Sequence, residues 1–168
     1  MIPEPYITLA RYHAWATREL IERHVAPMPE PQYRAERGLV FGSVHGTLNH
    51  LLVAERLWFA RFAGAELPVL ALDAEVEPDR EALARALLTS SAGWSGWLAD
   101  LDPARLDAVL VYTRVNGEAM RTPFGATLAH VFNHGTHHRG QISAALTGFG
   151  RPAPELDLIR MLQAEAAR

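Results

Sequence analysis

The segment from His130 to Ile142 reads HVFNHGTHHRGQI and contains four of the chain's eight histidines. At about 100° per residue, the apolar side chains around and within it share one helical stripe: Phe124, Val131, Ile142 and Ala145. The stretch therefore predicts a long helix. Thr122-Pro123 indicates its start, as an N-cap followed by proline at the first helical position, and Gly148 or Gly150 indicates its end.

Two histidines of this helix are predicted to point toward the core. His134 and His138 lie on or beside the apolar stripe, whereas His137 lies about 120° and His130 about 100° from its centre. Residues four apart on a helix have Cβ atoms roughly 5–6 Å apart, so two imidazoles can converge on one ion. A hydrogen-bonded pair of core histidines is the alternative reading, since HxxxH without further residues is a loose motif.

A third metal ligand must come from elsewhere, and His50 is the candidate. It lies in a helix predicted from Ser43, the N-cap, to Ala63, on the same face as Ala54 and Leu57. Taken alone, His50 also suits a hydrogen-bonded role in the core. For the remaining histidines, His13 and His45 stay open between the two roles, His24 reads as a charge near a helix C-terminus, and His130 and His137 read as surface or supporting groups.

The rest of the chain is predicted to be mostly helical. One helix runs from Tyr6 to about Val25, where three prolines follow, and another runs from Pro78-Asp79 to before Pro103. Between Asp107 and Arg121, β-branched residues and Asn116-Gly117 predict a hairpin with a two-residue turn. A short helix is expected after Pro154. Trp58 on the second long helix and Trp94 and Trp97 on the third fall at helical spacing, which is typical of core positions.

These elements predict an all-α fold, a four-helix bundle with a small β-hairpin before the fourth helix and a short C-terminal helix. Connections of 12 or more residues favour crossover-type links between the helices. No internal repeat, low-complexity tract or linker divides the sequence, so we expect residues 1–168 to form a single domain.

The composition narrows the chemistry. The 168 residues include no cysteine, so any metal must be held by His, Asp or Glu. A formal net charge of −3 with mixed signs gives no basic footprint for nucleic acid, and we expect no nucleic-acid partner. The first 25 residues lack an apolar signal segment and no run reaches a membrane span, so we expect a cytoplasmic protein without a membrane partner. HExxH, Glu-x-x-His, P-loop and G-x-S-x-G motifs are absent from the sequence.

Three segments together resemble a known family. HVFNHGTHHRGQI is similar to the fourth-helix signature of the DinB/YfiT superfamily of small helical metalloproteins. ARYHAWATREL (10–20) and GTLNHLLVAERLWFAR (46–61) are similar to its first-helix and second-helix motifs. The resemblance implies an up-down-down-up four-helix bundle, frequently a homodimer, with one divalent metal ion held by His50, His134 and His138. This chain departs from the family at His13 and Thr17, where Asn is usual, which affects the expected chemistry of the first helix.

Three neutral imidazoles leave a coordination position open, as in catalytic rather than structural zinc sites. By resemblance, the leading hypothesis is a metal-dependent enzyme, transferase-like or hydrolase-like, that transfers a low-molecular-weight thiol to a small electrophilic substrate. Zn is the expected metal, with Ni, Fe and Mn also suited to imidazole. No residue stands out as a general base; Arg139 and Gln141 are expected to pack or orient the site. The alternative is a stress-associated metal-binding bundle without turnover, which a fourth protein ligand would favour.

Overall fold

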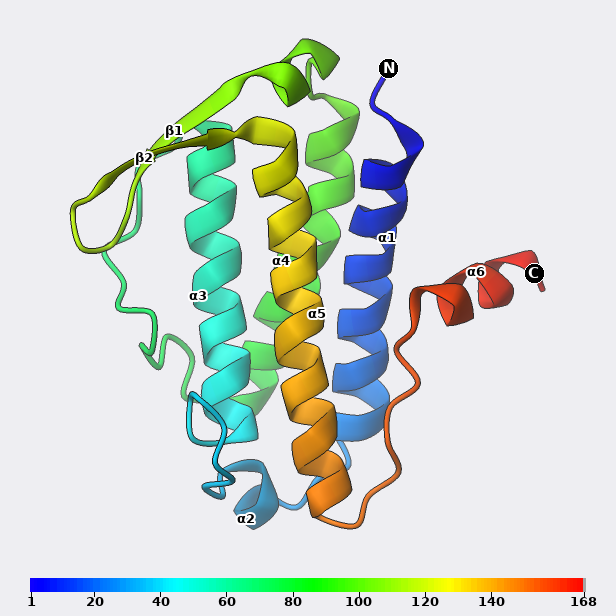
Figure 1. Cartoon of the computed structure of the whole chain (residues 1–168). Helices are drawn as coiled ribbons and strands as arrows, with labels where there is room; N and C mark the ends of the chain where they lie inside the picture. The colour runs from blue at the N-terminus through cyan, green and yellow to red at the C-terminus, as the bar shows by residue number, and fades with distance from the viewer. Residues whose placement is uncertain (168) are drawn as a thin grey trace.

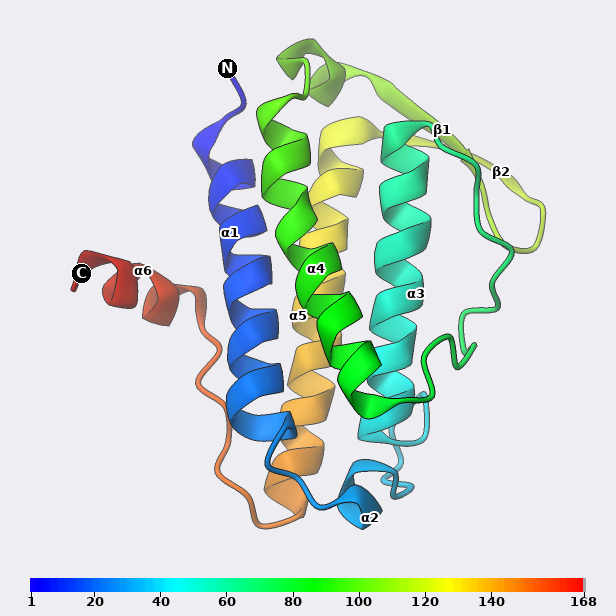
Figure 2. The same ribbon diagram turned by 180° about the vertical axis from the view of Figure 1, so that it is seen from behind.

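Four long helices lie side by side in the computed structural model, which describes residues 1–167 (Figure 1). They are α1 (Glu4–Glu19), α3 (Val44–Ala63), α4 (Arg80–Ala99) and α5 (Phe124–Gly148). Both α1 and α3 pack against α4 and α5, and the view from behind shows the same arrangement (Figure 2). The predicted mostly helical fold is confirmed.

Local sequence signals set where two of these helices begin. The Ser43 hydroxyl accepts a hydrogen bond of 3.1 Å from the backbone N–H of Gly46, so Ser43 caps α3 as predicted. Asp79 caps α4 in the same way, accepting from Ala82 N–H at 2.7 Å. At the other end of α3, Gly64 adopts the left-handed conformation with φ of 68°, which ends the helix at low steric cost.

The core between the helices consists of two large apolar clusters. One gathers around the Leu20, Leu52 and Leu146 side chains, and the other around Trp94, Phe62 and Phe132. Trp94 is fully buried, as expected of a core tryptophan, while Trp58 and Trp97 are half-buried. Burying side chains of this size stabilises the fold by about 1.5–3 kcal/mol each.

The hairpin pairs β1 (Val109–Thr113) with β2 (Ala119–Pro123) in antiparallel register, from Val109 opposite Pro123 to Thr113 opposite Ala119. The predicted two-residue turn is wrong: Arg114 and Glu118 still pair at 2.8 Å, so three residues form the loop. Gly117 occupies its last position with φ of 87°. A turn followed by a left-handed glycine is the usual three-residue solution, and it uses the same Asn-Gly signal.

The start of α5 also differs from the prediction. Thr122 does not cap the helix, because it is still paired in β2, and Pro123 takes the N-cap position. The Thr122 hydroxyl instead lies 2.7 Å from that of Thr127 in the first turn of α5. The strand therefore runs directly into the helix, which ties the hairpin to α5.

Three short elements were not predicted. The end of the first helix continues as a π-helical turn, Leu20–Val25, and the proline-rich connection after it contains α2 (Glu30–Tyr33). A 3₁₀ helix spans Pro103–Asp107. In α2 and the 3₁₀ helix, proline stands in the first turn, where its missing N–H costs nothing. The C-terminal helix α6 (Leu158–Ala166) is present as predicted.

Within residues 1–167, no helix combines the length and apolar character needed to cross a membrane.

Candidate metal centre

His50 on α3 meets His134 and His138 on α5. The His134 Nε2 atom lies 3.0 Å from His138 Nε2 and 3.3 Å from His50 Nε2, and one ring nitrogen of each residue lies within 4.8 Å of the others. Two nitrogens bound to one tetrahedral Zn²⁺ at about 2.0–2.1 Å would lie roughly 3.3–3.4 Å apart. The sequence-predicted triad is therefore brought together at a spacing that suits a shared metal ion.

Hydrogen bonds on the far side of two rings determine which nitrogen faces this centre. His50 Nδ1 lies 2.7 Å from the Leu72 carbonyl oxygen, and His138 Nδ1 lies 2.8 Å from Gln141 Oε1. Because these oxygens accept, each Nδ1 carries the proton and each Nε2 presents a lone pair. The lone pairs of His50 and His138 thus both face the ring of His134, and the three nitrogens form a donor set that fits a metal ion.

Burial and mutual repulsion keep these imidazoles neutral. Burial, followed by the charges of neighbouring histidines, lowers the pKa of His134 to about 3. Burial also lowers the pKa of His138 to about 4, and it lowers that of His50 despite the opposing Leu72 hydrogen bond. At neutral pH the three rings are therefore in the unprotonated form that binds metal.

Phe41 covers one side of the triad. Its ring stacks on His50 with centroids 3.7 Å apart and an interplanar angle of 13°, and its edge meets His138 at 5.7 Å. Gly46 permits this approach, because a Cβ there would lie 2.0 Å from the Phe41 carbonyl oxygen. A side chain at position 46 would thus displace the Phe41 backbone from its present position.

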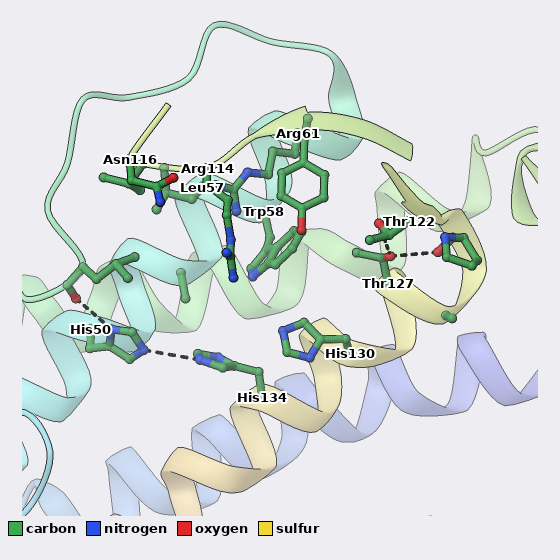
Figure 3. Close-up of a pocket in the computed structure, with 16 residues that line it drawn as sticks. His50, Leu57, Trp58, Arg61, Arg114, Asn116, Thr122, Thr127, His130 and His134 are labelled. Atoms are coloured by element: carbon green, nitrogen blue, oxygen red, sulfur yellow. Dashed lines mark hydrogen bonds between the residues drawn. The ribbon is translucent and has the colours of Figure 1, made fainter. Parts of the chain in front are cut away.

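A pocket of about 890 Å³ opens on another side of the triad, between α3, α5 and the hairpin. His50 and His134 line it, together with apolar groups and two arginines, Arg61 and Arg114. Figure 3 shows His50, His130 and His134 along one side of the pocket, with Arg61, Arg114 and Asn116 across from them. A small molecule in this pocket would have direct access to the triad.

Behind the triad lies a polar cluster that the sequence alone did not reveal, named here the buried network: His13, Glu55, Trp94 and Arg139. Each of the four long helices contributes one member. His13 Nε2 lies 2.5 Å from Glu55 Oε1, Trp94 donates to Glu55 Oε2 at 2.6 Å, and Arg139 donates to His13 Nδ1 at 3.2 Å. Because arginine only donates, His13 accepts at Nδ1 and donates from Nε2 to the carboxylate. The buried network thus links the guanidinium of Arg139 to the carboxylate of Glu55 through the ring of His13.

Gly135 makes room for the buried network. A Cβ at this position would lie 2.6 Å from His13 Cε1 and 2.9 Å from Arg139 Nη1. The two departures from the family pattern lie here: His13 is a member, and the hydroxyl of Thr17 is 3.4 Å from Arg139 Nη1. Both are buried and neither lines the large pocket, so they serve the packing of α1 against its neighbours.

The other residues singled out from the sequence are not members of the triad. His130 is exposed and lines the pocket with its ring edge-on to Trp58, and His137 is exposed beside Gln141. His45 is buried and bonded to Tyr33 and Glu75, and His24 lies in the last turn of the first helix with a pKa lowered mainly by burial. The side chain of Gln141 orients His138, and that of Arg139 packs in the core, which are the two roles expected from the sequence.

Comparison with known proteins identifies the family of the chain. The family model described as "DinB family" matches residues 3–168. The chain belongs to the DinB family. It is 28% identical over 155 residues to the protein named Protein DinB of Bacillus subtilis (strain 168), a match that covers 89% of this chain and 88% of that protein. The segment 130–142, which resembles the family's fourth-helix signature, lies in α5, and the segment 46–61, which contains His50, lies in α3.

Proposed function

We propose that this DinB-family protein is a metal-dependent enzyme that transfers a low-molecular-weight thiol to a small electrophilic substrate. His50, His134 and His138 are the proposed ligands of one divalent metal ion per chain, Zn²⁺ first, with Ni²⁺, Fe²⁺ or Mn²⁺ as alternatives suited to imidazole. The observation that carries the proposal is the pocket of about 890 Å³ that adjoins two of the three histidines.

The open side of the triad favours catalysis over storage of a structural ion. Structural zinc sites are closed by four protein ligands, whereas catalytic sites keep a position for water or substrate. Among residues 1–167, the group of side chains placed to share an ion consists of three histidines, with no fourth His, Asp or Glu. A site that only stabilises the fold has no need for a pocket beside it.

Residues around the triad orient and shield the three histidines. When bound, a divalent ion would supply the positive charge that favours a thiolate over a thiol at neutral pH. Leu72 and Gln141 hold two of the imidazoles in the ligating orientation, and Phe41 shields the triad on one side. In the transfer itself, the thiol sulfur forms a bond to the electrophilic carbon, the leaving group departs with the bonding pair, and the thiol proton passes to solvent.

The order of the helices and the oligomeric state are also part of the proposal. We place the four long helices in the up-down-down-up order, since the long connection between α3 and α4 is the kind of link that lets consecutive helices run parallel. A homodimer is proposed from the family resemblance.

The ligand assignment is tested by measuring metal content in purified His50→Ala, His134→Ala and His138→Ala variants. His137→Ala is the matched control, because His137 is an exposed histidine on the same helix. We expect about one metal ion per chain in the wild type and control and a large loss in the three variants. Undiminished metal content in the three variants would refute the triad.

Thiol transfer is tested with glutathione, bacillithiol and mycothiol, each offered with 1-chloro-2,4-dinitrobenzene, in which chloride is the leaving group. Metal-loaded wild type should form a thioether with at least one thiol, and the metal-free protein and His134→Ala should not. Absence of metal-dependent product with every thiol would favour the binding-only alternative.

A further inference from the structure

The arginine at the far end of the large pocket has an unusual environment. Arg61 lies eleven residues after His50 on α3, which places the two on nearly the same helix face and roughly 16 Å apart along the axis. Its guanidinium lies over the rings of Trp58, at 4.6 Å, and Tyr112, at 4.8 Å. Trp58 is one turn nearer to His50, so the Arg61 side chain leans back toward the triad.

The Arg61 guanidinium is poorly satisfied. One amino group donates to the Thr113 carbonyl oxygen at 3.2 Å, while Nε is buried without a hydrogen-bond partner. No carboxylate within residues 1–167 lies within 4.0 Å of it. Burial without a counter-charge also lowers the pKa of Arg61. A half-buried cation of this kind has more to gain from an incoming anion than an exposed arginine does.

The rest of the pocket indicates what kind of anion would fit. Its lining contains no Asp or Glu, and the second arginine, Arg114, is already paired with Glu118 at 2.9 Å. One free guanidinium matches one negative charge. Between Arg61 and the triad the walls are largely apolar, with Leu57, Trp58 and Leu72 among them. A ligand that crosses the pocket therefore needs an apolar body.

We propose that this pocket binds a small organic carboxylate, with the carboxylate group on Arg61 and the apolar body extending toward His50 and His134. This inference rests on the proposed function, since it names the class of ligand that the same pocket takes. The planar fork of arginine matches a carboxylate with two parallel hydrogen bonds, which the two terminal amino groups of Arg61 can donate into the pocket that this residue lines.

The test compares an anion with a neutral molecule of the same shape, 3-phenylpropionate and 3-phenylpropionamide, by titration calorimetry on the full-length, metal-free protein. A charge-assisted bidentate contact should make the carboxylate bind at least about tenfold more tightly than the amide. Arg61→Gln should remove this preference, and Arg61→Lys should keep only part of it. Arg56→Gln is the matched control, since Arg56 is on the same helix but does not line this pocket, and it should bind like the wild type.

Two outcomes of this comparison would overturn the Arg61 site. One is equal binding of the two probes, or binding of neither, by the wild type. The other is a preference that survives in Arg61→Gln, either without metal or in the Zn²⁺-loaded protein, where survival would place the carboxylate on the metal. A further variant, Ala126→Trp, tests whether the probes bind in this pocket, because the larger side chain narrows it and should lower the affinity for both probes. Unchanged affinity for both would also overturn the site.

Zn²⁺ uptake, measured by adding the metal to the same preparations, separates this inference from the proposed function. A protein that takes up Zn²⁺ through the triad but shows no Arg61-dependent preference would overturn the carboxylate site and leave the metal-dependent function standing. An Arg61-dependent preference in a protein whose triad variants keep their metal would support the carboxylate site and refute the proposed metal ligands.

Discussion

Replacement of Glu55 by glutamine should lower the free energy of unfolding by about 3–5 kcal/mol, although the two side chains have nearly the same size. The reason is the position of Glu55 at the centre of the buried network. Its two carboxylate oxygens accept from His13 and Trp94, and the carboxylate offsets the charge of Arg139, which is 2% exposed.

The magnitude follows from the donors around position 55. His13 and Trp94 both donate, and a glutamine has one oxygen that can accept from them, so its NH₂ group must face a second donor. A buried donor left without an acceptor costs about 1–3 kcal/mol. The guanidinium of Arg139 would then also lack its counter-charge. These two losses together account for the expected range, which lies at the upper end of single-residue effects.

The pKa of Glu55 also reflects the stabilising contacts of its carboxylate. Burial on its own would raise this pKa, but the contacts with His13, Trp94 and Arg139 outweigh burial and hold it below its usual value. An acid with a lowered pKa in the folded state stabilises the protein above its unfolded pKa of about 4.3. That contribution disappears as the pH falls through the folded pKa, and Glu55→Gln should remove it at every pH.

Urea unfolding followed by circular dichroism at pH 7 measures the effect, and the melting temperature should fall by about 6–20 °C. Glu81→Gln is the control: its partner Arg85 lies 3.6 Å away, with side-chain exposures of 85% and 69% for Glu81 and Arg85. This exposed pair should contribute no more than about 1 kcal/mol. If both variants lose the same small amount, the buried network does not stabilise the fold as argued.

Three further predictions concern α5. Gln141→Leu removes the acceptor for His138 Nδ1 and should weaken Zn²⁺ binding about 10–100-fold in a competition with a chromophoric chelator, whereas Gln141→Glu should not. In metal-free protein, the unfolding free energy should fall as the pH drops from about 6.5 toward 4, because His134 and His138 bind protons in the unfolded state but stay unprotonated in the folded state. Urea unfolding at pH 7, 6 and 5 measures this dependence. An unfolding free energy that does not change over this range would contradict the prediction. Gly135→Ala should destabilise the protein by about 1–3 kcal/mol through its clash with the buried network, while Gly140→Ala, which meets nothing within 4 Å, should be neutral or stabilising in the same thermal melts.

Helical periodicity was sufficient to predict the long helices and the residues of the triad. His134 and His138 share a face because they are four residues apart, and the apolar neighbours of His50 turn it inward. Those rules are local to one helix. They also predicted that His130 and His137 would lie at the edge or outside, where the structure has them exposed.

Contacts between distant segments could not be predicted in this way. His13 and Glu55 are 42 residues apart, and Arg139 reaches His13 across 126 residues, so no spacing rule connects them. The signals that existed were indirect: a glutamate among apolar residues of α3 and a glycine within the α5 motif. The Leu72 carbonyl, which orients His50, lies in an irregular connection, where side-chain patterns carry little information.

Two consecutive residues of α5 link the buried network to the proposed metal centre. His138 and Arg139 project about 100° apart around the helix, so one faces the triad while the other faces α1. Once Arg139 is fixed by His13, rotation of α5 about its axis is restricted, and the direction of His138 is restricted with it. A buried charged network is not needed for stability alone, since proteins with apolar residues of similar volume in its place are often as stable or more stable. Its placement directly behind the histidines is better explained by the precise orientation that three converging imidazoles require.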